Sequence, residues 1–302
     1  MSDPVRAHVP LVPVPARQPP LDPGMAADDA LRLVLLETLA QVRGNVPVVV
    51  QARDSEGLHQ LRVGLRRLRT VLKMTGHDEL DARAKGLLNT IGPARDGDVF
   101  LTELLLPVIA ELGSRRGFDV LRARAERARD QAWAKAVALI AGPEFRGFDE
   151  DVAAAAVTWP DPAGIRAVAP AILDAALARA RKRGRPFDEL DPPERHRLRI
   201  ALKKLRYAAE FFAPLYPKKT VKAWLKPLKE LQDMLGHLND VAQVESTLER
   251  LILGETGSAL VQADLNGAAA LLTGHYQVRA DDVAAKAGKR WKKFRDAAPF
   301  WV

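Results

Sequence analysis

Two stretches of this sequence place basic residues and leucines in the same helical rhythm. The first is HQLRVGLRRLR, residues 59–69, and the second is HRLRIALKKLR, residues 196–206. Six positions are identical at a constant offset of 137 residues, and an Arg-Arg pair in the first stretch is a Lys-Lys pair in the second. Leucines that recur every three or four residues are typical of an amphipathic α-helix with one buried face. The sequence therefore predicts two equivalent helices, each with one face in a core.

The segments that follow these helices repeat as well. LLNTIGPARDGDV aligns with LQDMLGHLNDVAQ, which places Asp96 opposite Asp240 at an offset of 144 residues. A period this long is not that of a solenoid array. We expect an internal duplication that gives two helical bundles related by a pseudo-twofold axis, with repeat one at about 25–150 and repeat two at about 163–302.

Helical periodicity covers the chain past Met25, and no segment alternates like a β-hairpin, so the expected fold class is all-α. A break is expected around AGPEFRGFDE and WPDPAG. Residues 1–24 are rich in proline, which prevents a helix, and are expected to form a flexible tail. The expected helices are 26–43, 56–75, 78–92, 97–113, 117–141, 165–183, 194–213, 218–236, 240–254 and 258–296.

The composition indicates which cellular compartment suits the chain and which kinds of metal site it cannot have. The chain has 302 residues and no cysteine, which excludes disulfides and thiolate metal sites and is compatible with a reducing compartment. No apolar run reaches the ~18 residues that span a bilayer, and the N-terminus has no continuous apolar region of a secretory signal. We expect a cytoplasmic protein without a membrane partner.

The two basic helices carry the whole net charge of +8. Residues 56–75 hold five basic residues and one acid, and residues 193–210 hold six basic and two acidic residues, so each segment contributes +4. A solvated helix face usually mixes signs, because like charges one turn apart cost stability. The alternative to a binding face is a charged face that is only solvated and has no ligand. A single-sign face that occurs twice favours an anionic ligand.

Each basic face lies opposite its leucines when residues are placed about 100° apart around a helix. Arg67 and Lys204 fall off these faces. A third basic face follows, although Pro227 makes its helical register less secure. The candidate binding residues are His59, Arg62, Arg66, Arg69 and Lys73, then His196, Arg199, Lys203 and Arg206, and with less security Lys222, Lys226 and Lys229.

The paired histidines and aspartates leave alternatives open. His59 and His196 begin the two basic faces, and they either donate to a phosphate oxygen or are structural. Asp96 and Asp240 are expected to cap the helices that follow, and the alternative is that they orient basic side chains. Asp78, after His77, is also expected to be an N-cap rather than part of a metal dyad.

Signatures of common enzyme classes are absent from the sequence. There is no P-loop, no H-E-x-x-H and no G-x-S-x-G, and no carboxylate cluster is placed to hold a catalytic metal. We therefore expect no catalytic residues, no metal and no cofactor. A phosphate-ester hydrolase is the least favoured of the alternatives.

The paired basic helices, the LG…ND segment after the second and the terminal WKKFRDAAPFW resemble the CHAD family, the conserved histidine α-helical domain, from about Leu21 to the C-terminus. The resemblance implies two helical bundles around a central basic pore or groove that binds inorganic polyphosphate, in some members on polyphosphate granules. The candidate residues given above would then line that pore. The E-x-E-x-K signature of the triphosphate-tunnel domain found in many members does not occur here, so triphosphatase activity is not implied.

The residues themselves agree with such a ligand. Polyphosphate carries charge along its whole length but no base, and it needs point charges and forked donors along a path. Binders of single-stranded nucleic acid usually add aromatic stacking platforms, and Tyr207 is the only aromatic residue near either basic face. With polyphosphate as the ligand, nucleic acid is expected only as a weaker competitor, and a nucleic-acid-binding helical protein is the alternative function.

Overall fold

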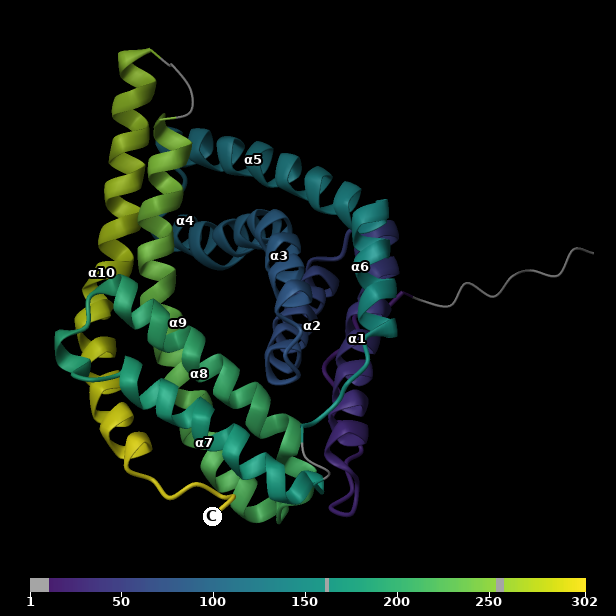
Figure 1. Ribbon diagram of the computed structural model, residues 1–302. Coiled ribbons are helices and arrows are strands. Elements are labelled where there is room, and N and C mark those ends of the chain that lie inside the picture. The colour runs from purple at the N-terminus through teal and green to yellow at the C-terminus, as the bar shows by residue number, and fades with distance from the viewer. Residues whose placement is uncertain (1–10, 161–162, 254–257) are drawn as a thin grey trace, which may run out of the picture.

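The structure is a computed structural model that describes residues 11–160, 163–253 and 258–302 (Figure 1). Over these ranges the chain is all-α, as predicted, and it contains no β-strand beyond an isolated bridge between Ala26 and Gly164. The first series of helices is α1 (Ala27–Ala52), α2 (Ser55–Met74), α3 (Asp78–Val99), the π-helical η1 (Phe100–Leu105), α4 (Leu106–Leu112), α5 (Arg116–Ala141) and α6 (Pro143–Ala154). The second series is α7 (Ile165–Arg183), η2 (Phe187–Glu189), α8 (Pro192–Phe212), η3 (Ala213–Leu215), α9 (Lys218–Leu253) and α10 (Ala259–Arg295).

Several helices are longer than the sequence predicted. α1 continues to Ala52, α3 passes through Pro93 and runs directly into η1, and α6 occupies much of the expected break. The clearest correction is α9, which is one helix where two were predicted. Its buried stripe of Leu235, Val241 and Val244 continues across the expected gap. Packing of that stripe outweighs the local turn signal of the Asn-Asp pair.

The two basic helices begin at well-formed caps. The Asp54 carboxylate accepts from the Gly57 backbone N–H at 2.7 Å at the start of α2. α8 starts with a capping box between Asp191 and Glu194, with Pro192 in its first turn. Such caps satisfy backbone donors that the first helical turn leaves free. The caps therefore set the residue at which each basic helix starts, and with it the first residue of its basic face.

The predicted leucine stripes form the core. Leu61, Leu65 and Leu68 of α2 and their counterparts on α8 are fully buried. Gly64 lets α1 approach closely, because a Cβ there would lie 2.9 Å from Val42. The main apolar cluster contains residues of both series, so the core is shared.

A second, smaller apolar cluster also joins the two series. Phe100 of η1 and Phe118 of α5 pack with Leu248 of α9 and Leu272 of α10. Figure 1 shows α5 running across to the α9–α10 hairpin. Neighbours follow the order α1–α2–α3 in one series and α7–α8–α9 in the other. This order parallels the proposed duplication, which stays a prediction.

The described part of the N-terminal segment packs against α1 and α2. Val14 donates to the Asn45 side chain at 2.9 Å and accepts from it at 2.8 Å. The Arg17 carbonyl accepts from Arg67 at 3.3 Å, and Leu21 is buried. The sequence predicted a flexible tail over 1–24; within it Val14, Arg17 and Leu21 make the contacts given above, residues 1–10 lie outside the described residues, and the flexibility of the tail stays a prediction.

By length and composition α1 is able to cross a membrane, with a mean hydropathy of 1.4 in its most apolar 18-residue window. No run of that kind was expected from the sequence. Half of this window is buried inside the protein, where α1 packs against α2, α5 and α7. Such burial is typical of the core helix of a soluble domain.

Candidate anion-binding site

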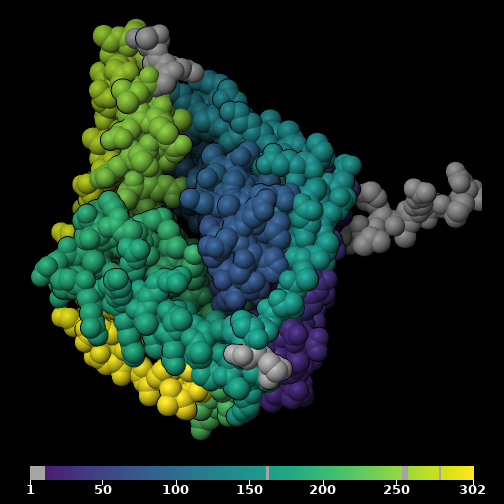
Figure 2. Space-filling view, in the orientation of Figure 1, coloured from purple at the N-terminus to yellow at the C-terminus, as the bar shows by residue number. Residues whose placement is uncertain are grey.

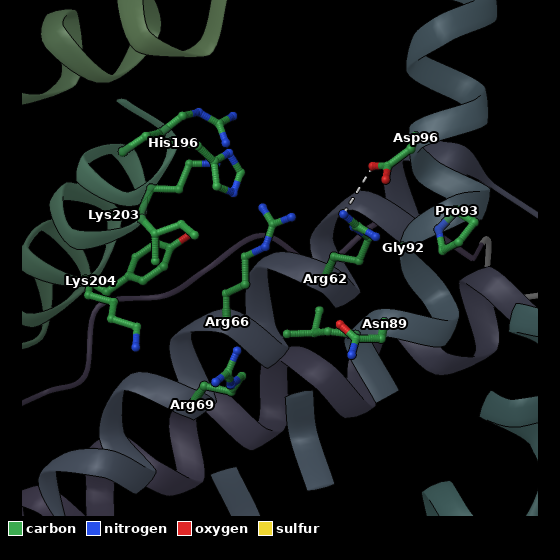
Figure 3. Close-up of a pocket in the computed structure, with 14 residues that line it drawn as sticks. Arg62, Arg66, Arg69, Asn89, Gly92, Pro93, Asp96, His196, Lys203 and Lys204 are labelled. Carbon is green, nitrogen blue, oxygen red and sulfur yellow. Dashed lines mark hydrogen bonds and ion pairs between the residues drawn. The ribbon is translucent and has the colours of Figure 1, made fainter. Parts of the chain in front are cut away.

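A pocket of about 530 Å³ lies where α2 and α8 face each other, with α3 as a third wall. Figure 2 shows the surface hollowed between the blue α2–α3 hairpin and the green second series. In Figure 3 Arg66 extends from α2 toward His196 and Lys203 of α8. The basic residues that line the pocket are Arg62, Arg66, Arg69, His196, Arg199, Lys203 and Lys204.

Six of the predicted binding residues line this pocket, three from each repeat. Six others lie outside its lining: His59, Lys73, Arg206, Lys222, Lys226 and Lys229. Lys73 pairs with Asp78 at 2.6 Å beside a neighbouring pocket between α2 and α7. Lys222 and Lys226 are exposed on α9. The structure therefore brings the two predicted basic faces together, but not the third.

Glu210 accounts for two of the predicted residues outside the pocket. Its carboxylate lies 3.7 Å from Arg206 and 3.7 Å from Lys229. It also pairs with Arg67 at 3.1 Å. One acid at the end of α8 thus neutralises part of the cationic cluster that the sequence assigned to the ligand.

The two residues that the sequence placed off the basic faces have different roles. Lys204 lines the pocket, so its off-face placement was wrong: its long side chain reaches the cavity from the side of α8. Arg67 is buried, and its guanidinium lies 4.8 Å from the centre of the Phe211 ring. With Glu210 and the Arg17 carbonyl as partners, Arg67 acts as a structural cation.

The three aspartates do not cap helices as predicted. Asp96 and Asp240 lie inside α3 and α9, and His77 rather than Asp78 is the N-cap residue of α3. The alternative role holds for Asp96, whose carboxylate accepts from Arg62 at 3.3 Å (Figure 3). Asp240 interacts electrostatically with Arg199. Asp96 thus pairs with Arg62, whereas no ion pair joins Asp240 to Arg199 among the described residues.

Arg62 is held against the wall formed by α3. Its side chain is 10% exposed, and burial with repulsion from Arg66 lowers its pKa to about 10. A Cβ at Gly92 would lie 2.8 Å from the Arg62 Nη1, so a larger residue at position 92 would displace the Arg62 guanidinium from this position. That Nη1 is buried and has no hydrogen-bond partner among the described residues. Gly92 was not among the residues predicted from the sequence, and it lines the pocket on α3.

Lys203 is the most perturbed cation in the pocket. Burial, together with the charges of Arg199, Arg66, Arg206 and Arg62, lowers its pKa to about 6. Burial also lowers the pKa of Arg199, whose Nε has no hydrogen-bond partner in the described part of the chain. Buried donors without acceptors are costly, and a bound anion would satisfy them.

The two histidines differ. The His196 Nδ1 lies 2.6 Å from the Asn239 amide oxygen, which can only accept, so Nδ1 carries the hydrogen of this bond, and His196 lines the pocket. The pKa of His59 is lowered by burial, followed by repulsion from Arg95. Arg95 and Asn239 are aligned in the two repeats. The residue beside His196 thus accepts a hydrogen bond from it, whereas the aligned residue in the first repeat is a cation that repels a charged His59.

The arrangement is suited to binding an anion rather than a metal. The pocket collects guanidinium, ammonium and imidazole groups, and Asp96 is its only carboxylate. Within residues 11–160, 163–253 and 258–302, no group of three or more His, Asp or Glu is placed to hold a metal ion. The fold and site define an all-α protein with a basic pocket shared by two helical series.

Comparisons with known proteins identify the family. The profile of the CHAD domain matches residues 33–249. The CHAD domain from the plant Ricinus communis is similar in structure, with a TM-score of 0.80 and 26% identity over 95% of this chain and 98% of that chain. PptA from Streptomyces chartreusis has a TM-score of 0.69 and 15% identity over 89% of this chain and 100% of that chain, which shows a shared fold. No curated protein matched the sequence.

This chain belongs to the CHAD domain family. Polyphosphate binding is a general property of that family, and the domain is a non-catalytic helical binding domain within it. The family thus supports a polyphosphate-related role for this chain.

Proposed function

We propose that this protein binds inorganic polyphosphate in the pocket between α2 and α8. The observation that carries the proposal is the meeting of six predicted basic residues, from helices more than a hundred residues apart in sequence, around one cavity. Their like charges repel one another unless an anion lies between them. Polyphosphate supplies such an anion at every repeat.

The lining favours polyphosphate over nucleic acid. Tyr207 is the only aromatic side chain of the lining apart from the imidazole of His196, and it is only 3% exposed. The Arg206 guanidinium lies 5.4 Å from its ring centre. A buried ring next to a guanidinium offers no platform for successive bases, which single-stranded nucleic acids require.

The proposed role is binding without catalysis, with location on polyphosphate granules in the cytoplasm. The pocket has arginine and lysine donors for phosphate oxygens but a single carboxylate, already paired with Arg62. Phosphoryl transfer normally needs a metal and a group that activates the nucleophile. Incubation with long-chain polyphosphate and Mg²⁺ is therefore expected to release no phosphate.

The decisive experiment compares two variants that each lose three positive charges. The pocket variant combines Arg62→Ala, Arg66→Ala and Arg199→Ala. The matched control combines Arg43→Ala, Arg122→Ala and Arg197→Ala, whose guanidiniums are exposed and paired with surface acids. Each charge-assisted contact is worth about 1.5–3 kcal/mol, so the pocket variant should bind long-chain polyphosphate at least ~100-fold more weakly.

The control should change affinity only mildly, because exposed ion pairs contribute about 0–1 kcal/mol. Calorimetry at matched salt gives both affinities, and circular dichroism verifies that both variants are folded. Pyrophosphate and an oligonucleotide serve as competing ligands, and both should bind more weakly than the long chain. Equal losses in the two variants would show that bulk charge, and not this pocket, holds the anion.

A further inference from the structure

We propose that Lys203 is a site of covalent acylation by acyl phosphates, which dock their phosphate on the surrounding arginines and transfer the acyl group to the lysine Nζ. The inference rests on the proposed function in one respect: both need the pocket to hold a phosphate group. It adds a modification site and a class of reagent, small anionic mixed anhydrides.

The surroundings of Lys203 explain why its amine is a nucleophile. Among the described residues, no ion pair joins Lys203 to an acid. The two acids beside the pocket act on other cations, since Asp96 pairs with Arg62 and Asp240 interacts with Arg199. Glu210 pairs with Arg67, Arg206 and Lys229. The Lys203 amine thus faces cations from both α2 and α8.

An ammonium in such a place loses its proton. The pKa of Lys203 is lowered to about 6 by burial and by the four neighbouring guanidiniums. At pH 7 such an amine is about 90% neutral, whereas a lysine with an ordinary pKa near 10.4 is about 0.04% neutral. Only the neutral amine has the lone pair that attacks a carbonyl, and burial beside other cations is a known way to activate lysine.

The same neighbours hold the other half of the reagent. Arg62 Nη1 and Arg199 Nε are buried donors without acceptors in the described residues, and Arg66 extends from α2 toward Lys203 in the same pocket (Figure 3). Guanidinium donors match phosphate oxygens in geometry and charge. A phosphate held there places its attached acyl carbon beside the Lys203 Nζ, and such proximity raises the rate.

The reaction balances without a further reagent. The Nζ lone pair forms a bond to the acyl carbon, and the bond from that carbon to the phosphate oxygen breaks. Inorganic phosphate leaves with the electron pair, and the proton lost from nitrogen passes to water. The product is a neutral amide at Lys203. Because the amide cannot take up a proton, acylation weakens the pocket for polyphosphate.

The test treats the full chain with acetyl phosphate at pH 7 and follows each lysine by mass spectrometry. Cleavage after Glu194 and Glu210 releases residues 195–210, in which fragmentation separates Lys203 from Lys204. Exposed Lys222 and Lys226 of α9 are the internal controls. A weaker base is also a weaker nucleophile, which offsets part of the gain in neutral amine, so we expect an initial rate at Lys203 at least ~10-fold that at the controls.

Three further readouts separate this mechanism from simple exposure of the lysine. The rate at Lys203 should level off above about pH 7, whereas a lysine with an ordinary pKa near 10.4 reacts about tenfold faster per pH unit up to pH 9. Arg66→Ala should slow acylation by acetyl phosphate more than acylation by an uncharged activated ester, because only acetyl phosphate uses the arginines. Long-chain polyphosphate should protect Lys203.

Equal rates at Lys203 and Lys222, or a Lys203 rate that still rises tenfold per unit above pH 8, would overturn the inference. An equal effect of Arg66→Ala on both reagents would overturn the docking step and with it the proposal. Polyphosphate binding measured on the unmodified chain keeps the two ideas apart. Binding without selective acylation rejects this inference alone, and selective acylation without binding rejects the proposed function alone.

Discussion

The basic helices α2 and α8 carry the same sequence motif and equal net charge, yet they differ in which of their cations form ion pairs with protein carboxylates. On α2, Arg62 pairs with Asp96, Arg69 with Asp81 at 2.6 Å and Lys73 with Asp78. On α8, Arg199 and Lys203 take part in no ion pair within the described residues, and burial lowers the pKa of both. In the described part of the chain, three cations of the α2 face are thus paired with protein carboxylates and Arg66 is not, whereas on the α8 face only Arg206 is paired, with Glu210.

The difference arises from a few substitutions between the repeats. At the offset of 137 residues Lys73 corresponds to Glu210, so one face ends in a base and the other in an acid. Arg66 corresponds to Lys203, which places an amine that can lose its proton opposite a guanidinium that cannot. The two helices have equal formal charge but differ in ion pairing and in side-chain pKa. We therefore expect the anion affinity to depend more on α8.

The largest expected effect comes from matched double variants of the two faces. Arg199→Gln with Lys203→Gln should weaken polyphosphate binding by at least ~30-fold, since two charge-assisted contacts are lost. Arg69→Gln with Lys73→Gln should weaken it by less than ~5-fold, because these cations are already paired. Calorimetry on folded proteins, verified by thermal melting, measures both. Equal losses would remove the distinction between the faces.

The next largest effect is a pH dependence of polyphosphate affinity that arises from Lys203 of α8. The Lys203 pKa is depressed to about 6 in the free protein, and a bound polyanion raises it by favouring the ammonium. Binding therefore takes up a proton above pH 6, and affinity should fall about tenfold as pH rises from 6 to 8.

Lys203→Arg tests this assignment because an arginine keeps its charge over the whole range. Its affinity should stay nearly constant between pH 6 and 8. Proton uptake, measured by calorimetry in buffers of different ionisation enthalpy, should disappear with the substitution. A wild-type pH dependence that persists in Lys203→Arg would assign the titration to another group.

A smaller effect should appear when a competing carboxylate is removed from the α2 side. Asp96→Asn frees Arg62 from its ion pair and should tighten polyphosphate binding by about threefold, the size of a partly exposed pair. Asp149→Asn removes an acid that pairs with exposed Arg43 and serves as the control. Weaker binding by Asp96→Asn would mean that the carboxylate positions Arg62 for the anion rather than competing for it.

The smallest effect separates the two histidines. His196 lines the pocket and is oriented by Asn239, whereas His59 lies outside the lining. His196→Ala should weaken binding about threefold, the value of one ordinary hydrogen bond, and His59→Ala should leave it unchanged. Competition binding at pH 7 measures both. Equal effects of the two substitutions would argue against the pocket boundary drawn here.

Periodicity was sufficient to predict the fold class and the core of the basic helices. The leucine stripes of α2 and α8 are buried as predicted, and their opposite faces meet around one pocket. The helix ends were less predictable. Pro93 and the Asn239-Asp240 pair look like breaks, but long-range packing carries α3 and α9 through them.

The composition of the site was only partly predictable. A helical wheel assigns a direction to each Cβ but not the reach of a long side chain, so Lys204 was placed outside a pocket that it lines. The compensation of Arg69 by Asp81 and of Arg206 by Glu210 depends on side-chain positions that the wheel does not give. The predicted roles of Lys222, Lys226 and Lys229 stay predictions.

The most direct test of the account is a crystal structure of the protein with a polyphosphate of defined chain length. The account predicts a continuous row of phosphates between α2 and α8, with phosphate oxygens about 3 Å from the Arg66 and Arg199 guanidiniums and from the Lys203 amine. Phosphates bound along the exposed lysines of α9, with the pocket between α2 and α8 free of them, would contradict it.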